Sequence, residues 1–188
     1  MSAPEPHDAL KEVIEANRFS RWLGWANMSA VAPPKGYCRW CGKPVTPPRR
    51  TWCSDECVAE GLIRNTSGSA ATQVYQRDKG VCATCGMDCE WLMDWWHRIQ
   101  YADPKRPQRW ESWREGWGTK TWQGATGWNP YQSLWQADHI IPVVEGGGCC
   151  GLENYRTLCV ICHKKDTAAL AARRAKHKQE ILEHDQTI

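Results

Sequence analysis

The sequence has little of the material from which one large apolar core is built. Only one of its 188 residues is Phe, and long aliphatic runs are few, although 41% of the residues are hydrophobic. No apolar run approaches the roughly 18 residues that a transmembrane helix requires. The length suffices for one ordinary domain or two small ones. We therefore expect a soluble protein with no membrane partner.

We also expect no secretory leader, because the N-terminus is not a basic segment followed by an apolar one. The chain nevertheless has 11 cysteines, and eight of them fall into CxxC or CxxxC pairs. Such pairs suit metal ions better than disulfides. We therefore expect an intracellular, cytoplasmic location. Three further cysteines, Cys89, Cys149 and Cys150, are interpreted as free thiols, with extra metal ligation as the alternative.

Two regions precede the C-terminal half. Residues 1–35 contain an expected helix from Asp8 to Phe19 and then a Pro-rich linker; the helix docks either on the body or on a partner. Residues 36–66 are expected to form a small zinc finger, treble-clef-like, with a helix that starts after Ser54. Such a finger binds DNA, binds a protein, or only stabilises the fold. Its four expected zinc ligands are Cys38, Cys41, Cys53 and Cys57.

Residues 70–185 form the third expected region, which contains a second four-cysteine zinc site. Its ligands are Cys82, Cys85, Cys159 and Cys162. Between the two halves of this site lies a Trp-rich insert at about 89–135, which holds nine of the 13 tryptophans. Its rings either build a small core of their own, the favoured interpretation, or stack on unpaired bases.

The end of the chain predicts a strand from about residue 136, a glycine-rich loop, a second strand at 155–160 and a helix at 166–183. This order is the outline of a ββα-metal finger in an α+β fold. Its side chains suit phosphodiester hydrolysis, which needs an activated water and a cation. Neighbouring strand residues face opposite sides, so Asp138 and His139 are not both expected to bind one ion. We therefore assign Asp138 as the metal ligand and His139 as the general base that deprotonates water. His163 supplies a second ligand, and Asn154 orients the loop, holds His139 or completes the metal shell.

The net charge of +3 does not by itself demand a nucleic-acid partner, but the cations are unevenly distributed. A basic run directly after His163 can neutralise phosphates, although a solvated helix face is the alternative. Its position favours DNA as the partner. The candidate DNA-binding residues are Lys164, Lys165, Arg173 and Arg174.

Residues 82–167 resemble an HNH endonuclease of the zinc-stabilised, four-cysteine type. The elements that carry the resemblance are Asp138-His139-Ile-Ile-Pro142, Leu152-Glu-Asn154 and Leu158-Cys159-Val-Ile-Cys162-His163-Lys164-Lys165. The finger, the insert and the glycine-rich loop are also similar to the nuclease end of some HNH-bearing annealing helicases.

The resemblance implies His139 as general base, and Asp138 with His163 as ligands of Mg²⁺, Mn²⁺ or Ni²⁺. It also implies DNA cleavage to 5′-phosphate and 3′-hydroxyl ends. Because no helicase motor precedes the motif in this sequence, we expect a stand-alone enzyme from a bacterium or a phage. If the protein is eukaryotic, we expect it in the nucleus. The alternatives are a non-catalytic zinc module that binds DNA or protein, and cleavage of RNA. Double-strand cleavage requires a dimer or two encounters.

Overall fold

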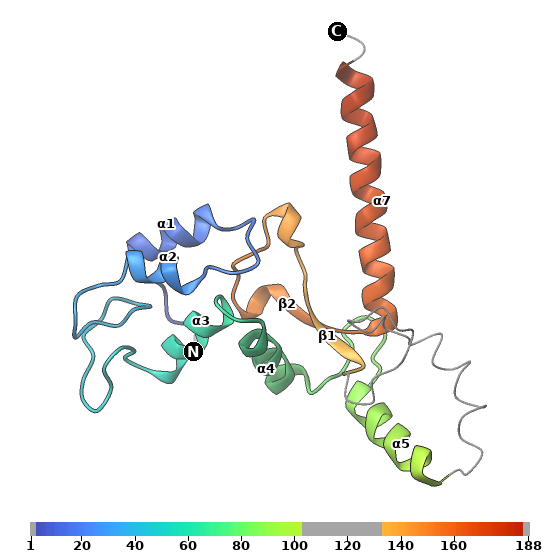
Figure 1. Cartoon of the computed structure of the whole chain (residues 1–188), viewed down its shortest axis with the longest axis horizontal. Coiled ribbons are helices and arrows are strands. Elements are labelled where there is room, and N and C mark those ends of the chain that lie inside the picture. The colour runs from blue at the N-terminus through green and yellow to red at the C-terminus, as the bar shows by residue number, and fades with distance from the viewer. Residues whose placement is uncertain (1–2, 103–132, 186–188) are drawn as a thin grey trace. The chain divides into compact units, whose positions relative to one another are not determined.

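The computed structural model describes residues 3–102 and 133–185. Figure 1 shows the elements in chain order: α1 (Asp8–Ala16), α2 (Trp25–Ala30), α3 (Asp55–Ile63), α4 (Ser67–Asp78), α5 (Cys89–Ala102), β1 (Trp135–His139), the 3₁₀ turns η1 (Val143–Glu145) and η2 (Leu152–Asn154), β2 (Tyr155–Cys159) and α7 (Val160–Asp185). The chain forms two compact units, Met1–Lys79 with Ala137–Arg156, and Gly80–Gln136 with Thr157–Ile188. No helix in the described ranges is long and apolar enough to cross a membrane.

The first unit packs the N-terminal helices against the first cysteine cluster. Leu10 of α1, Leu23, Met28 of α2 and Trp40 are each at most 1% exposed and belong to the same core as Cys38 and Cys57. The Trp40 indole Nε1 donates to the carbonyl of Pro4 at 2.6 Å. Helix α1 therefore docks on the body of the protein, which decides one question that the sequence left open.

Capping residues explain where the helices of the first unit start and end. Helix α1 stops at Ala16, earlier than predicted, because the amide of Asn17 turns back to donate to the carbonyl of Val13 at 2.8 Å. Helix α3 begins as predicted, and the Ser54 hydroxyl accepts from the backbone N–H of Cys57 at 3.2 Å. Helix α4 starts at Ser67, because the hydroxyl of Thr66 caps it by accepting from the N–H of Ser69 at 3.3 Å.

The second unit is organised around the second cysteine cluster. Its core consists of Cys82, Cys89, Leu134, Leu158, Cys159, Val160 and Cys162. Helix α5 begins at Cys89, beside this core. Within it, Trp91 and Trp95 stack with ring centroids 6.3 Å apart and are 62% and 38% exposed. The tryptophans of the insert from 110 to 128 lie outside the described residues, and the function of the insert stays open.

Strands β1 and β2 form a two-stranded sheet. Ile140 N donates to Asn154 O at 2.9 Å, and Val160 N donates to Leu134 O at 3.0 Å. The residue number falls in one strand as it rises in the other, so the pair is antiparallel, with residue 138 opposite 156 and residue 139 opposite 155. Helix α7 follows β2 directly. The α+β fold class and its strand–strand–helix order are confirmed.

The predicted start of the last helix was wrong by six residues. We expected it at Asp166, but α7 begins at Val160. The apolar residues Val160 and Ile161 are strand-like in type, and they continue into the helix because no Pro or Gly interrupts the segment. Cys162 and His163 consequently lie in the first turn of α7.

Candidate metal centres and active site

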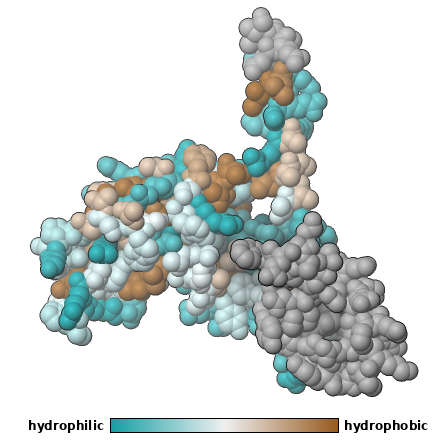
Figure 2. All heavy atoms as spheres, viewed as in Figure 1, coloured by the Kyte–Doolittle hydropathy of each residue, from teal (hydrophilic) through white to brown (hydrophobic). Residues whose placement is uncertain are grey.

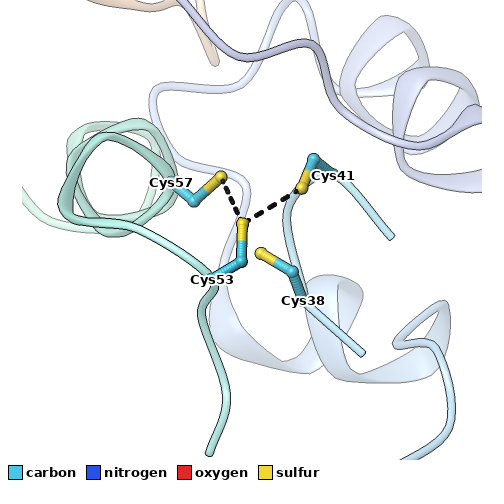
Figure 3. Close-up of side chains that lie close together, drawn as sticks. All are labelled: Cys38, Cys41, Cys53 and Cys57. Carbon is cyan, nitrogen blue, oxygen red and sulfur yellow. Dashed lines mark hydrogen bonds between the residues drawn. The ribbon is translucent and has the colours of Figure 1, made fainter. Parts of the chain in front are cut away.

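The first cysteine cluster is drawn in Figure 3, where the four sulfur atoms point toward one another from two loops and helix α3. The sulfurs lie within 4.8 Å of one another, with Cys41 and Cys53 3.5 Å apart and Cys53 and Cys57 3.6 Å apart. A tetrahedral zinc with Zn–S bonds of about 2.3 Å places its sulfurs about 3.8 Å apart. Cys38, Cys41, Cys53 and Cys57 therefore fit a structural zinc ion in both number and spacing.

The second cluster repeats this geometry in the other unit. Cys82, Cys85, Cys159 and Cys162 also lie within 4.8 Å of one another, and Sγ of Cys85 is 3.8 Å from Sγ of Cys159. Both clusters use the same turn, in which a Gly N–H bonds back to the carbonyl of the first cysteine at 2.9 Å. The turn places Gly42 and Gly86 at φ 72, a conformation that favours glycine.

One thiol in each cluster is prepared for deprotonation. Burial alone would raise the pKa of Cys38, but backbone N–H groups near its sulfur outweigh it and lower the pKa to about 7. At Cys82 burial would likewise raise the pKa, but backbone hydrogen bonds to the sulfur outweigh burial and lower the pKa to about 6. Because zinc binds the thiolate form, these donors favour metal binding.

The remaining cysteines belong to neither four-cysteine group. Cys89 and Cys149 are each 1% exposed. Burial, with the nearby thiols of the cluster, raises the pKa of Cys89 to about 12, and burial raises the pKa of Cys149 to about 11. Burial also raises the pKa of Cys150. These are the properties of packed, unreactive thiols, which supports the sequence-based interpretation.

The β1–β2 register brings together two cross-strand pairs at the candidate active site. Arg156 Nη2 lies 3.2 Å from Asp138 Oδ2. One position further along, the rings of His139 and Tyr155 pack with centroids 4.5 Å apart and an angle of 44°. Directly opposite residues in an antiparallel pair are close neighbours, and successive residues face opposite sides. The two pairs therefore occupy opposite faces of the hairpin.

His139 has the properties of a neutral imidazole with one open nitrogen. Burial lowers its pKa; the charge of Asp138 opposes this and the charge of Arg21 adds to it. Its Nε2 is buried and has no hydrogen-bond partner among the residues that the structure describes. A buried polar atom without a partner costs free energy unless a ligand or water satisfies it. A bound water molecule is one partner that would satisfy this atom.

Asn154 fixes the loop that follows β1. Its Oδ1 accepts from the N–H of Ile141 at 2.8 Å, while its Nδ2 donates to the carbonyls of Ile141 at 3.1 Å and Gly147 at 2.8 Å. Both ends of the amide are therefore bonded to the backbone of residues 141–147. Of the three roles considered from sequence, orientation of the loop is the one that these bonds support.

Sequence reasoning missed three residues that position the site, namely Arg77, Tyr155 and Arg156. Arg77 of α4 donates to the carbonyls of Leu152 at 2.9 Å and Tyr155 at 2.7 Å, which ties η2 and the start of β2 to α4. Tyr155 and Arg156 follow Asn154 directly in the sequence. A proposed hairpin register would have paired them with His139 and Asp138, and this is the signal that could have found them.

His163 is placed in the second unit, whereas Asp138, His139 and Asn154 are in the first. Its backbone adjoins the second cysteine cluster, in which Cys162 N donates to Sγ of Cys159 at 3.4 Å in the first turn of α7. The pairing of His163 with Asp138 on one ion stays a prediction. Lys164, Lys165, Arg173 and Arg174 follow on α7 and are exposed. The surface of this helix carries both polar and apolar side chains (Figure 2).

A carboxylate and a histidine are suitable donors for a divalent ion such as Mg²⁺, Mn²⁺ or Ni²⁺. Asp138 is a partly exposed carboxylate, with 23% of its side chain accessible, and it already interacts with a cationic side chain. The chemistry of the donor set therefore fits the ion that the family implies, and the carboxylate of Asp138 is reachable from solvent.

The chain contains two four-cysteine groups that fit zinc. It also contains a strand–loop–strand–helix segment with Asp-His at the end of the first strand. Together these features define a ββα-metal nuclease domain. Residues 127–169 match the family model of the HNH endonuclease, and this part of the chain belongs to that family. The match includes Asp138, His139, Asn154 and His163.

Two curated relatives extend the similarity beyond the motif. The mouse "DNA annealing helicase and endonuclease ZRANB3" is 32% identical over 183 residues, which is 80% of this chain and 16% of the relative. The human protein of the same name is 32% identical over 143 residues, 70% of this chain and 12% of the relative. The chain thus spans less than a fifth of these relatives.

A solved structure, the crystal structure of the human ZRANB3 HNH domain, is 28% identical to this chain. It covers 57% of this chain and 92% of its own, with a TM-score of 0.37.

Proposed function

We propose that this protein is a metal-dependent endonuclease that hydrolyses DNA phosphodiester bonds to 5′-phosphate and 3′-hydroxyl ends. The observation that carries the proposal is the unpartnered Nε2 of His139, next in sequence to the carboxylate of Asp138, within the residues that match the family. Eight cysteines hold two structural zinc ions. Asp138 and His163 hold one catalytic divalent ion, Mg²⁺, Mn²⁺ or Ni²⁺.

Each residue has a distinct task in the reaction. Nε2 of His139 takes a proton from the attacking water as the new P–O bond forms. The bond from phosphorus to the 3′ oxygen breaks, and the departing oxygen takes a proton from solvent. The ion, when bound, stabilises the negative charge that develops on the phosphate and the leaving oxygen. Tyr155 holds the imidazole by ring packing, and Asn154 holds the loop beside it.

DNA is the substrate in this proposal because the basic residues at the start of α7 follow the catalytic motif directly. Lys164, Lys165, Arg173 and Arg174 contact the phosphate backbone and supply affinity without sequence preference. The helix begins at the zinc cluster, so the same ion that positions His163 also positions these cations.

The decisive experiment incubates zinc-loaded protein with supercoiled plasmid, single-stranded DNA and RNA in the presence of Mg²⁺, Mn²⁺ or Ni²⁺. We expect nicked plasmid, and the nicks should be sealed by a DNA ligase without prior kinase treatment, which requires 5′-phosphate and 3′-hydroxyl ends. The His139→Ala variant is the matched control. DNA binding without cleavage under every ion would instead establish a non-catalytic zinc module.

A further inference from the structure

We propose that Arg21 contacts a phosphate of the DNA backbone beside His139, and that residues 18–23 form a wall of the active site. This segment lies more than 100 positions before the part of the chain that matches the HNH family. The inference rests on the proposed function, because it assigns a binding residue to the same site. Its evidence is the packing of the segment and the distribution of its charges.

The segment lies directly on the glycine-rich loop of the active-site hairpin. Gly148 N donates to the carbonyl of Arg18 at 2.6 Å. A Cβ atom added at Gly148 would collide with the carbonyl oxygens of Ser20 and Arg18, so the two backbones are in contact. The neighbouring Gly147 carbonyl is held by the amide of Asn154 at 2.8 Å. The segment is therefore connected to the hairpin through backbone groups, whose positions do not depend on flexible side chains.

Both ends of the segment are anchored. Ser20 N donates to the carbonyl of Asn17 at 2.7 Å, and the Ser20 hydroxyl donates to the carbonyl of Trp22 at 2.8 Å. Leu23 is fully buried, and its N–H donates to the carbonyl of Arg64 at 2.8 Å. A short stretch held at both ends presents its side chains from fixed positions, as a binding residue requires.

The two arginines of the segment differ in what they contact. Arg18 pairs with Glu15 at 3.0 Å, and its guanidinium lies over the ring of Phe19, 4.8 Å from the centroid. Arg21 is exposed and forms no ion pair with any residue in the described ranges. The charge of Arg18 is thus already used, whereas that of Arg21 is available to an anion.

The charge of Arg21 acts on the active site. After burial and the charge of Asp138, it is the next influence on the pKa of His139, which it lowers; it also lowers the pKa of Tyr155 against the larger, raising effect of burial. Arg21 therefore lies near His139 and Tyr155, and its exposed charge is complementary to a phosphodiester bound beside them.

Binding of a fluorescent DNA duplex by the zinc-loaded protein, over a series of salt concentrations without added divalent ions, tests the inference. Arg21→Gln should weaken affinity about tenfold. It should also reduce the slope of log K against log salt by about 0.9, the contribution of one phosphate contact. Arg21→Lys should keep the slope, and Arg18→Gln should stay within about twofold of wild type because its charge is already paired.

Unchanged binding by Arg21→Gln, or an equal loss in Arg18→Gln, would overturn the inference. In cleavage assays Arg21→Gln should raise KM more than it lowers kcat. Suppose that Arg21→Gln loses binding, and that the wild-type protein cleaves DNA with none of the three divalent ions. This result would leave the phosphate contact standing and refute the proposed function. Normal binding by Arg21→Gln in an active enzyme would refute only the contact.

Discussion

Arg156 Nη2 lies 3.2 Å from Asp138 Oδ2, and the two residues are directly opposite each other in the β1–β2 pair. Their side chains are 29% and 23% exposed, so solvent screens the interaction and its contribution to stability is small, about 0–1 kcal/mol. The contact matters instead because it occupies the carboxylate that we assign to the catalytic ion.

Replacement of Arg156 should therefore increase the affinity for a divalent ion. Arg156→Gln removes a cation that competes for Asp138, and we expect Mn²⁺ to bind several-fold more tightly while the melting temperature stays near that of wild type. Calorimetric titration of the zinc-loaded protein with Mn²⁺ measures this, with Arg156→Lys as the control that keeps the charge. Weaker Mn²⁺ binding by Arg156→Gln would show that Arg156 supports the metal site.

Removal of the general base should abolish cleavage without unfolding the protein. We expect His139→Ala to lower the rate of plasmid nicking about 10²- to 10⁴-fold, the usual contribution of a positioned base. His177→Ala changes an exposed histidine on α7 and serves as the control. Zinc content and circular dichroism should match wild type in both variants. A His139→Ala variant that nicks normally would remove this residue from the chemistry.

Truncation of Asn154 should loosen the loop beside the site. Asn154→Ala loses three hydrogen bonds to the backbone of residues 141–147, and we expect a loss of about 1–3 kcal/mol in the free energy of unfolding. Urea denaturation measures the difference. Asn27→Ala, which loses an amide hydrogen bond to the carbonyl of Leu23 and a longer one to the side chain of Asn17, should cost less. Equal costs would mean that the loop gains nothing special from Asn154.

The two kinds of buried cysteine should respond differently to substitution. Cys162→Ser removes a ligand of the second cluster, and we expect about one zinc per chain in place of two, with loss of helical structure in the C-terminal region. Cys89→Ser changes a buried thiol outside the cluster and should keep both ions. Elemental analysis after purification without chelators distinguishes them. Two zinc ions in Cys162→Ser would exclude this cysteine as a ligand.

The basic start of α7 should account for part of the affinity for DNA. We expect the double change Lys164→Gln and Lys165→Gln to reduce the salt slope by about 2, and further replacement of Arg173 and Arg174 to reduce it again. The pair Lys176→Gln and Lys178→Gln, further along the helix, is the matched control. An equal effect of both lysine pairs would indicate general attraction to the helix and no defined interface.

The cysteine spacing was sufficient to predict both four-cysteine clusters, because ligand number and short CxxC spacing restrict the geometry of a zinc site. The start of α3 was also predictable, since Ser54 and the acids after it act locally. The start of α7 was not, because Val160 and Ile161 suit a strand as well as a helix. Arg77 was missed for a different reason: it bonds to carbonyls more than 70 residues away.

The sequence by itself determined the two four-cysteine groups that could hold zinc, the strand–loop–strand–helix order and the family to which residues 127–169 belong. All three depend on residue type and spacing within short segments. The tertiary structure decided which residues lie opposite Asp138 and His139. It decided as well which backbone groups form hydrogen bonds with the side-chain amide of Asn154. It also decided that residues 18–23 pack on the glycine-rich loop. These relationships depend on strand register and on contacts between distant segments, and a single sequence specifies them only through the folded chain.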